Sequence, residues 1–143
     1  MQNYPTKEEI LVKEIIFDKD TLQAMKLFKS RWVQAKKEVK TIEVSASRKK
    51  KLLKALVKEI SKINKTKVKI TFKHNVCNYN YKTKIININE SLSIISTLHE
   101  LGHHLFGESE LTACRWSVWL FKKTFPISYK KLRWDGHILK KII

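Results

Sequence analysis

The segment His99-Glu100-Leu101-Gly102-His103 places two histidines and a glutamate at the spacing H-E-x-x-H. Residues four apart share one face of an α-helix, so His99 and His103 can direct two imidazoles at one metal ion. Glu100 follows His99 by about 100° of helical rotation. Its carboxylate then lies beside the metal, where it can take a proton from a water molecule. The pattern predicts a zinc site built for hydrolysis.

A third protein ligand is needed, because a catalytic zinc ion normally has three protein ligands and one open position. Gly107 predicts the end of the motif helix, since glycine accepts the left-handed conformation. Ser109 predicts the N-cap of a second helix, with Glu110 in its first turn. A tight turn between the two helices would bring Glu110 back beside the two histidines. Glu110 is therefore the predicted third ligand. The alternatives are Glu108, His74 and His137.

The motif helix is predicted to begin at Ser91, which can cap it. Ile94, Leu98, Leu101 and Leu105 recur at spacings of four, three and four, as on one side of a helix. His99 and His103 lie on the shoulder of this apolar stripe, which predicts a cleft edge rather than the deep core. His104 falls on the polar side and is predicted to be a surface residue.

The second helix is predicted to be largely buried. Glu110, Ala113 and Ser117 fall on one side, where small residues let two helices approach closely. Its other faces are apolar, which predicts core packing rather than an aromatic binding site. The apolar residues are Leu111, Cys114, Trp116, Val118, Trp119, Leu120 and Phe121.

Hydrophobic periodicity predicts helices over residues 6–17, 21–37 and 47–63 in the first half of the chain. Alternating patterns then predict short strands over 68–72, 76–81 and 84–88. Either of the last two strands could be a sheet edge that pairs with an extended peptide beside the metal. Tyr79 and Tyr81 could then reach the cleft and stabilise an oxyanion, although exposed strand tyrosines are the simpler reading.

Length and composition predict one domain over residues 1–143 with a real core. Its parts are a helical N-terminal region of about 1–65, a catalytic core of about 66–125 and a C-terminal segment, 126–143. In that segment, residues 134–137 are predicted to form a surface turn, with a cleft-covering role for His137 as the alternative. Cys77 and Cys114 fit no metal or disulfide pattern and are predicted to be buried free thiols in a reducing compartment. We therefore expect a cytoplasmic protein, without a signal peptide or a transmembrane helix.

The net charge is +17, from 30 Lys and Arg against 13 Asp and Glu. Such an excess favours contact with nucleic acid, and the dominance of lysine over arginine predicts contacts mainly to phosphates. An AT-rich coding sequence is the competing explanation for the many lysines. The densest basic run, residues 48–51, is predicted to be a solvated surface.

The stretch Thr97-Leu98-His99-Glu100-Leu101-Gly102-His103-His104-Leu105, after a short Ile/Asn strand, resembles the ImmA/IrrE family of metallopeptidase domains of bacteria, phages and mobile elements. The helix that follows the motif in that family carries a glutamate, a small residue three positions later and an aromatic residue three beyond, a pattern matched here by Glu110, Ala113 and Trp116. The resemblance covers about residues 68–123. It implies an α+β, zincin-like fold and a zinc ion held by His99, His103 and Glu110. It also implies that Glu100 is the catalytic base. The family's distribution implies a protein of a bacterial cell or a phage-infected host. The spacing of seven positions from His103 to Glu110 is shorter than is usual in the family. SprT-like proteins share the layout, but their third histidine has no counterpart here.

The sequence thus predicts a zinc-dependent endopeptidase that acts on a protein or peptide substrate. The resemblance suggests a regulatory protease directed at a DNA-associated protein. The alternative is a basic nucleic-acid-associated protein whose zinc site is structural or inactive. A hydrolase of small peptides is a third option, and manganese or iron could replace zinc.

Overall fold

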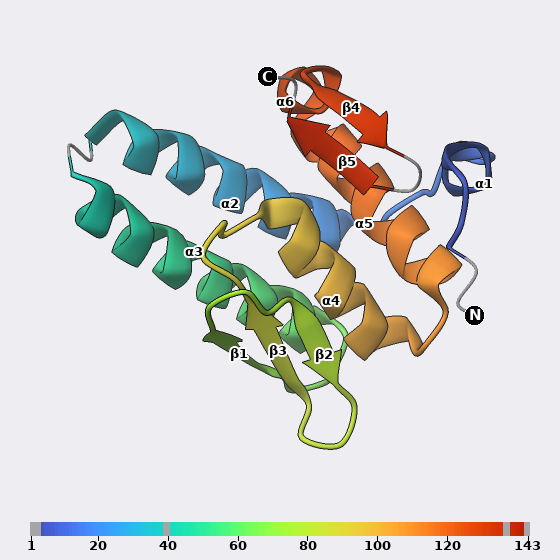
Figure 1. Ribbon diagram of the computed structural model, residues 1–143, viewed down its shortest axis with the longest axis horizontal. Helices are drawn as coiled ribbons and strands as arrows, with labels where there is room; N and C mark the ends of the chain where they lie inside the picture. Colours follow the sequence, from blue (N-terminus) through green and yellow to red (C-terminus); the bar gives the residue numbers. More distant parts are fainter. Residues whose placement is uncertain (1–3, 39–40, 136–137, 142–143) are drawn as a thin grey trace.

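Helices and two small sheets make up the structure, a computed structural model that describes residues 4–38, 41–135 and 138–141 (Figure 1). The predicted α+β class is confirmed. The elements are α1 (Lys7–Leu11), α2 (Lys19–Glu38), α3 (Ile42–Ile63), β1 (Lys69–Phe72), β2 (Asn78–Asn80), β3 (Ile85–Ile88), α4 (Ile94–Phe106), α5 (Glu110–Thr124), α6 (Pro126–Lys130), β4 (Leu132–Asp135) and β5 (Ile138–Lys141).

The first predicted helix is wrong beyond Leu11. Thr6 and Glu9 form a capping box that starts α1 as expected. The carbonyl oxygen of Ile10, however, accepts hydrogen bonds from Arg115 Nη1 at 2.8 Å and from Trp119 Nε1 at 3.0 Å. Side chains of α5 therefore form the hydrogen bonds that a backbone amide would have made to this carbonyl in a further helical turn. Helix α1 accordingly ends at Leu11.

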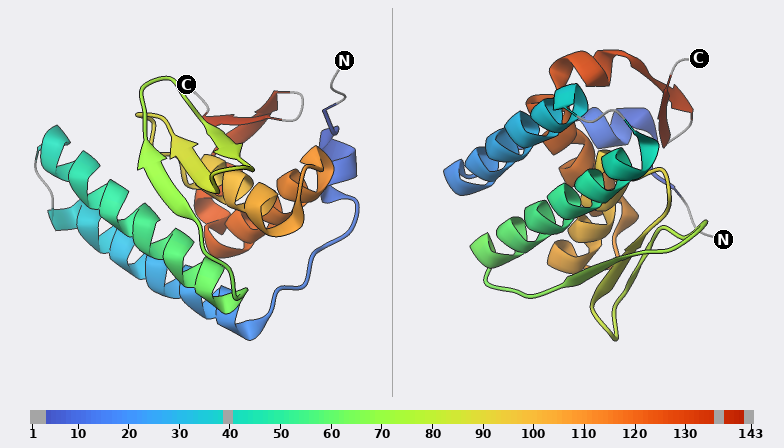
Figure 2. Two further views of the ribbon diagram at one scale, coloured as in Figure 1. Left: turned by 90° about the horizontal axis from the view of Figure 1, so that it is seen from below. Right: turned by 90° about the vertical axis from the view of Figure 1, so that its left-hand side faces the viewer.

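The next two helices form a long antiparallel hairpin (Figures 1 and 2). Helix α2 matches the predicted range of 21–37 closely. Helix α3 begins five residues earlier than predicted, because the Thr41 side chain accepts a hydrogen bond from the Val44 amide and caps it.

Helix α4 occupies the centre of the fold, packed against α3, α5 and the three-stranded sheet. Its residues Leu98 and Leu101 are fully buried and join side chains of the hairpin, of β3 and of α5 in one core. Burial of such leucines stabilises a fold by roughly 1.5–3 kcal/mol each. The helix that carries the histidines is thus held rigidly from three sides.

The three-stranded sheet has the order β1-β3-β2. Strand β3 pairs in parallel with β1 and antiparallel with β2, so it is central, and its residues Ile86 and Ile88 are fully buried. The sequence offered two strands as the possible sheet edge. The prediction is wrong for residues 84–88, which form the central strand, and is confirmed for the strand within 76–81. Strand β2 lies at the edge that packs beside α4.

The C-terminal segment forms α6 and the antiparallel pair β4–β5, which the sequence did not predict. Trp134 lies in β4 rather than in a turn, and its indole donates to the Tyr129 hydroxyl at 3.3 Å. His137 lies outside the described residues. Within the described ranges, no helix combines the length and apolar character needed to cross a bilayer.

Candidate metal centre

Helix α4 carries the H-E-x-x-H segment as predicted, but Ser93, not Ser91, is its N-cap. The Ser93 hydroxyl accepts a hydrogen bond from the Ser96 amide at 3.2 Å. Ser91 instead donates to the Asn89 side chain in the preceding turn. Gly107 ends the helix at a φ of 96°, a conformation that favours glycine, so this expectation is confirmed.

Ser109 caps α5 as predicted, through a 3.1 Å hydrogen bond from the Thr112 amide, and the helix begins at Glu110. A Cβ atom added to Gly102 would lie 3.2 Å from Cα of Ala113. Helices α4 and α5 therefore approach more closely here than a larger residue would allow. This close approach lets the short arm of Glu110 reach the histidines.

Ligand atoms of three side chains converge between the two helices. The Nε2 atoms of His99 and His103 lie 3.2 Å apart. Glu110 Oε1 lies 2.8 Å from His103 Nε2, and Glu110 Oε2 lies 3.2 Å from His99 Nε2. Around tetrahedral zinc with bonds of about 2.0–2.1 Å, neighbouring ligand atoms are separated by about 3.3 Å. The observed spacing is close to that of a zinc ligand set.

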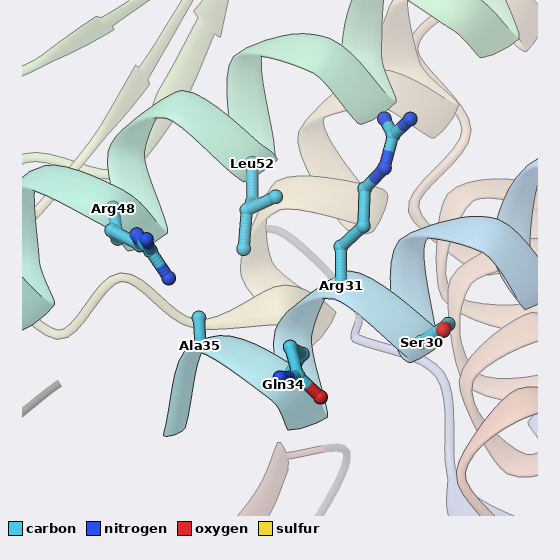
Figure 3. Close-up of a pocket in the computed structure, with 6 residues that line it drawn as sticks. All are labelled: Ser30, Arg31, Gln34, Ala35, Arg48 and Leu52. Atoms are coloured by element: carbon cyan, nitrogen blue, oxygen red, sulfur yellow. The ribbon is translucent and has the colours of Figure 1, made fainter. Parts of the chain in front are cut away.

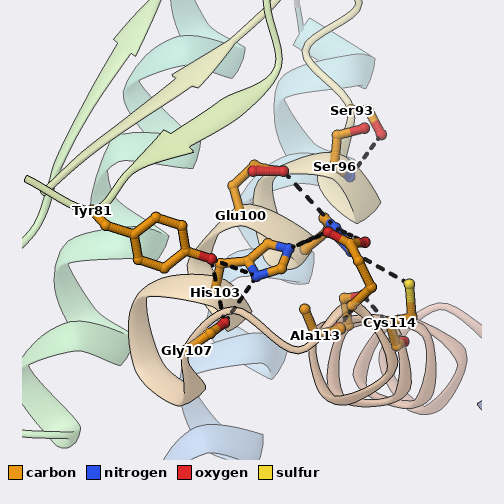
Figure 4. A network of polar contacts seen from close by, with 11 residues as sticks. Tyr81, Ser93, Ser96, Glu100, His103, Gly107, Ala113 and Cys114 are labelled. Atoms are coloured by element: carbon orange, nitrogen blue, oxygen red, sulfur yellow. Dashed lines mark hydrogen bonds and ion pairs between the residues drawn. The ribbon is translucent and has the colours of Figure 1, made fainter. Parts of the chain in front are cut away.

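The contacts of His103 Nδ1, on the side of the ring away from Glu110, indicate that this nitrogen carries a hydrogen atom. Nδ1 lies 2.9 Å from the Gly107 carbonyl oxygen, which can only accept, so Nδ1 carries the hydrogen. The Tyr81 hydroxyl lies 3.0 Å from the same nitrogen and donates to Gly107 O over 3.4 Å (Figure 4). His103 Nε2 then faces His99 Nε2 and the Glu110 carboxylate, an arrangement that a cation between the three side chains would stabilise. The donor set therefore fits a metal ion.

Glu100 lies beside this set rather than within it. Its Oε1 atom is 3.9 Å from His99 Nε2, and the residue is only 8% exposed. Burial raises the pKa of the Glu100 carboxyl to about 7, with Glu110 adding to the rise and His103 opposing it. A carboxyl poised near neutral pH can both take up and return a proton. Glu100 is an alternative third ligand, because it forms with His99 and His103 a group that could hold a metal ion. Its 3.9 Å contact with His99 is longer than the contacts of Glu110, which favours Glu110.

A second possible ligand group uses the other side of His99. Cys114 Sγ lies 3.7 Å from His99 Nδ1, and His99, Glu110 and Cys114 also bring their ligand atoms together. Burial, helped by Glu110 and Glu100, raises the pKa of the Cys114 thiol to about 12. Cys114 faces Nδ1 of His99, whereas Nε2 of the same ring faces His103 and Glu110, so we favour the set of His99, His103 and Glu110.

The prediction that Cys114 is buried is confirmed, but Cys77 is exposed, which is a correction. His74 lies on the surface, 3.2 Å from Glu90, and not among the converging atoms. Glu108 is exposed and lines the cavity without joining the histidine contacts. Of the alternative ligands, only His137 falls outside the described residues.

His104 is wrongly predicted as a surface residue. Its ring is half-buried between Tyr79 and Thr66, with 2.6 Å from the Tyr79 hydroxyl to Nδ1 and 2.8 Å from Thr66 Oγ1 to Nε2. Burial lowers the pKa of the His104 imidazole, and Lys84 lowers it further. The helical wheel gave no sign of these partners, because they come from β2 and from the loop after α3.

A cavity of about 410 Å³ opens beside the converging atoms. Its lining comes from β2 and the residues that flank it, from α4, from the start of α5 and from the connection between the two helices: Cys77, Asn78, Tyr79, Tyr81, Glu100, His103, Glu108 and Glu110. Another hollow, of about 320 Å³, lies between α2 and α3 and contains none of the histidines (Figure 3).

The chain matches no protein-family model, no curated protein and no solved structure.

Proposed function

We propose that this protein is a zinc-dependent endopeptidase with a zincin-like arrangement of α4 and α5. The observation that carries the proposal is the convergence of His99 Nε2, His103 Nε2 and Glu110 within 3.2 Å of one another, with buried Glu100 alongside. A catalytic zinc site needs such a three-ligand set with one side open, and the cavity of about 410 Å³ supplies the opening.

A zinc ion bound there would supply Lewis-acid polarisation of a substrate carbonyl and would make water more acidic. The protein's own residues then have separate tasks. Glu100 takes the proton from the attacking water and returns it to the leaving amine, a role for which its buried position beside His99 suits it. Gly107 O and Tyr81 hold the His103 ring in the tautomer that leaves Nε2 free to bind.

The edge strand β2 supports a peptide as the substrate. Asn78 and Tyr79 of this strand line the cavity, and within the described ranges β2 pairs with β3 alone. An extended peptide could add to its outer side by main-chain hydrogen bonds and pass its scissile bond over the metal. Tyr81 lines the cavity, and its hydroxyl lies 3.0 Å from His103 Nδ1, a contact that favours ligand positioning over oxyanion stabilisation.

The experiment combines metal analysis with an unbiased peptide library read by mass spectrometry for new termini. We expect one zinc per chain and cleavage that a chelator abolishes. Glu100→Gln should retain zinc and lower the rate by about 10²–10⁴-fold, because it removes a general base. Glu108→Gln, an exposed carboxylate in the same cavity, is the matched control and should cleave normally. Zinc-independent cleavage, or none at all, would contradict the proposal.

The sequence resemblance extends the proposal to a regulatory protease of the ImmA/IrrE type, in the cytoplasm of a bacterial or phage-infected cell. The high positive charge is compatible with a substrate that is itself bound to DNA. The natural substrate would then be a DNA-associated protein.

The alternative proposal is a nucleic-acid-associated protein with a structural zinc site. The net charge of +17 favours it. Structural sites, however, normally enclose the metal with four protein ligands. In the part of the chain that the structure describes, the favoured set has three protein ligands beside an open cavity, which supports the catalytic interpretation.

A further inference from the structure

A row of lysines runs along the outer face of α3, remote in sequence from the metal ligands. Lys51, Lys54, Lys58 and Lys62 follow one another at spacings of three, four and four, and all four are exposed. On the opposite side of the helix, Leu53, Leu56, Val57 and Ile60 are buried in the core. The four lysines, here called the α3 lysine row, extend over about 16 Å of one rigid helix.

Basic residues outnumber acidic ones on the helix that carries this row. Helix α3 contains seven basic residues against two acidic ones. Arg48 forms an ion pair with Glu38 at 2.9 Å and lines the hollow between α2 and α3 (Figure 3). None of the four lysines of the row makes an ion pair with a carboxylate among the described residues. Parallel positive charges on one helix repel, so a polyanion laid along them would relieve that repulsion.

The neighbouring strand extends the positive surface. Lys50 and Lys54 place their Nζ atoms 5.6 and 5.8 Å from the centre of the Phe72 ring, which puts this face of α3 beside β1. Lys69 and Lys73, in and just after β1, are exposed as well. The positive surface is therefore wider than a single helix face.

The chemistry of the surface favours a duplex over a single strand. Single-stranded nucleic acid is usually bound by exposed aromatic rings on which bases stack. The exposed aromatic residues of the described chain are Tyr4, Tyr81 and Phe106, and none lies on α3 or β1. Lysine is a point charge suited to phosphate oxygens, whereas base-edge reading favours arginine, asparagine and glutamine.

We propose that the α3 lysine row binds the phosphate backbone of a nucleic-acid duplex without regard to sequence. The interaction is electrostatic, because each lysine that contacts a phosphate displaces a counterion from the duplex. This function is independent of the proposed zinc chemistry, because the row belongs to α3 and none of its residues lines the metal cavity.

The test is a fluorescence titration of the full chain with a 20-base-pair DNA duplex of arbitrary sequence, at several salt concentrations. The variant Lys51→Gln/Lys54→Gln/Lys58→Gln/Lys62→Gln should bind at least about tenfold more weakly. Its slope of log affinity against log salt should fall by about 3–4, since each lost phosphate contact removes about 0.9. The double variant Lys54→Gln/Lys58→Gln should lose about half as much slope. Circular dichroism checks that both variants fold.

The matched control changes the same amount of charge elsewhere: Lys7→Gln/Lys13→Gln/Lys82→Gln/Lys130→Gln, all at exposed positions. This control should keep most of the salt slope. Equal losses in the two fourfold variants would overturn the proposal, because binding would then follow net charge alone. Absence of duplex binding by the wild type, or tighter binding to phosphatidylserine vesicles than to the duplex, would also overturn it. A parallel titration with duplex RNA assigns the backbone to DNA or RNA.

Discussion

Glu110 Oε1 lies 2.8 Å from His103 Nε2, although a helix end and the start of the next helix separate the two residues. The contact depends on Gly107 to end α4, on Ser109 to cap α5 and on the close packing of Gly102 against Ala113. The connection between α4 and α5 is only three residues long, and it brings Glu110 beside the histidines of the preceding helix.

Replacement of Glu110 should remove a metal ligand. We expect Glu110→Gln to lower zinc affinity by more than about 100-fold, beyond the 10–100-fold typical of residues that only support a ligand. Glu108→Gln is the control, because Glu108 lines the same cavity but makes no contact with the histidines. Competition with a chromophoric chelator measures both. Equal affinities in the two variants would show that Glu110 is not the third ligand.

Tyr81 and Tyr79 offer a matched pair of phenols. The Tyr81 hydroxyl contacts Nδ1 of His103, whereas the Tyr79 hydroxyl contacts Nδ1 of His104. Tyr81→Phe should lower zinc affinity by about tenfold, because it removes support from a ligand ring. Tyr79→Phe should lower the free energy of unfolding by about 1 kcal/mol and leave zinc affinity unchanged. The reverse result in zinc titration and thermal unfolding would show that Tyr81 does not position His103.

The local features of the site were predictable from the sequence, and the partners from distant elements were not. Gly107, Ser109 and Glu110 follow capping rules that act over three or four residues, and their predicted positions are confirmed. The contact of Tyr81 with His103 depends on the pairing of β2 with β3 and on the packing of β2 against α4, which no local pattern encodes. The same holds for the early end of α1, set by Arg115 and Trp119 of α5. Ser91 misled the prediction because two serines two residues apart were both suitable caps.

Replacement of Cys114 distinguishes the favoured ligand set from the group that contains a thiol. If zinc is held by His99, His103 and Glu110, Cys114→Ala should keep one zinc per chain with an affinity within about threefold of wild type, well short of the 10–100-fold lost with a supporting residue. The substitution should still lower stability by about 1 kcal/mol, since it truncates a buried side chain. Metal analysis after dialysis measures the first effect. Loss of zinc would instead favour the group of His99, Glu110 and Cys114.

The raised pKa of Glu100 predicts how the metal-free protein responds to pH. The folded state holds the proton of Glu100 up to about pH 7, whereas the unfolded chain releases it near 4.5. Its protonation therefore favours folding fully below pH 4.5, and this contribution is lost as pH rises through 7. A shift of this size corresponds to a few kcal/mol, at about 1.4 kcal/mol per pH unit.

Glu100→Gln, which is neutral throughout, isolates this contribution. Urea unfolding in excess chelator should give the variant the larger free energy of unfolding at pH 8, relative to wild type, with the difference shrinking steadily towards pH 4.5. Glu108→Gln should show no such pH-dependent difference, because the Glu108 side chain is exposed. A difference between Glu100→Gln and wild type that stays constant from pH 4.5 to 8 would show that burial does not raise the pKa of Glu100, and would remove the poised carboxyl from the proposed mechanism.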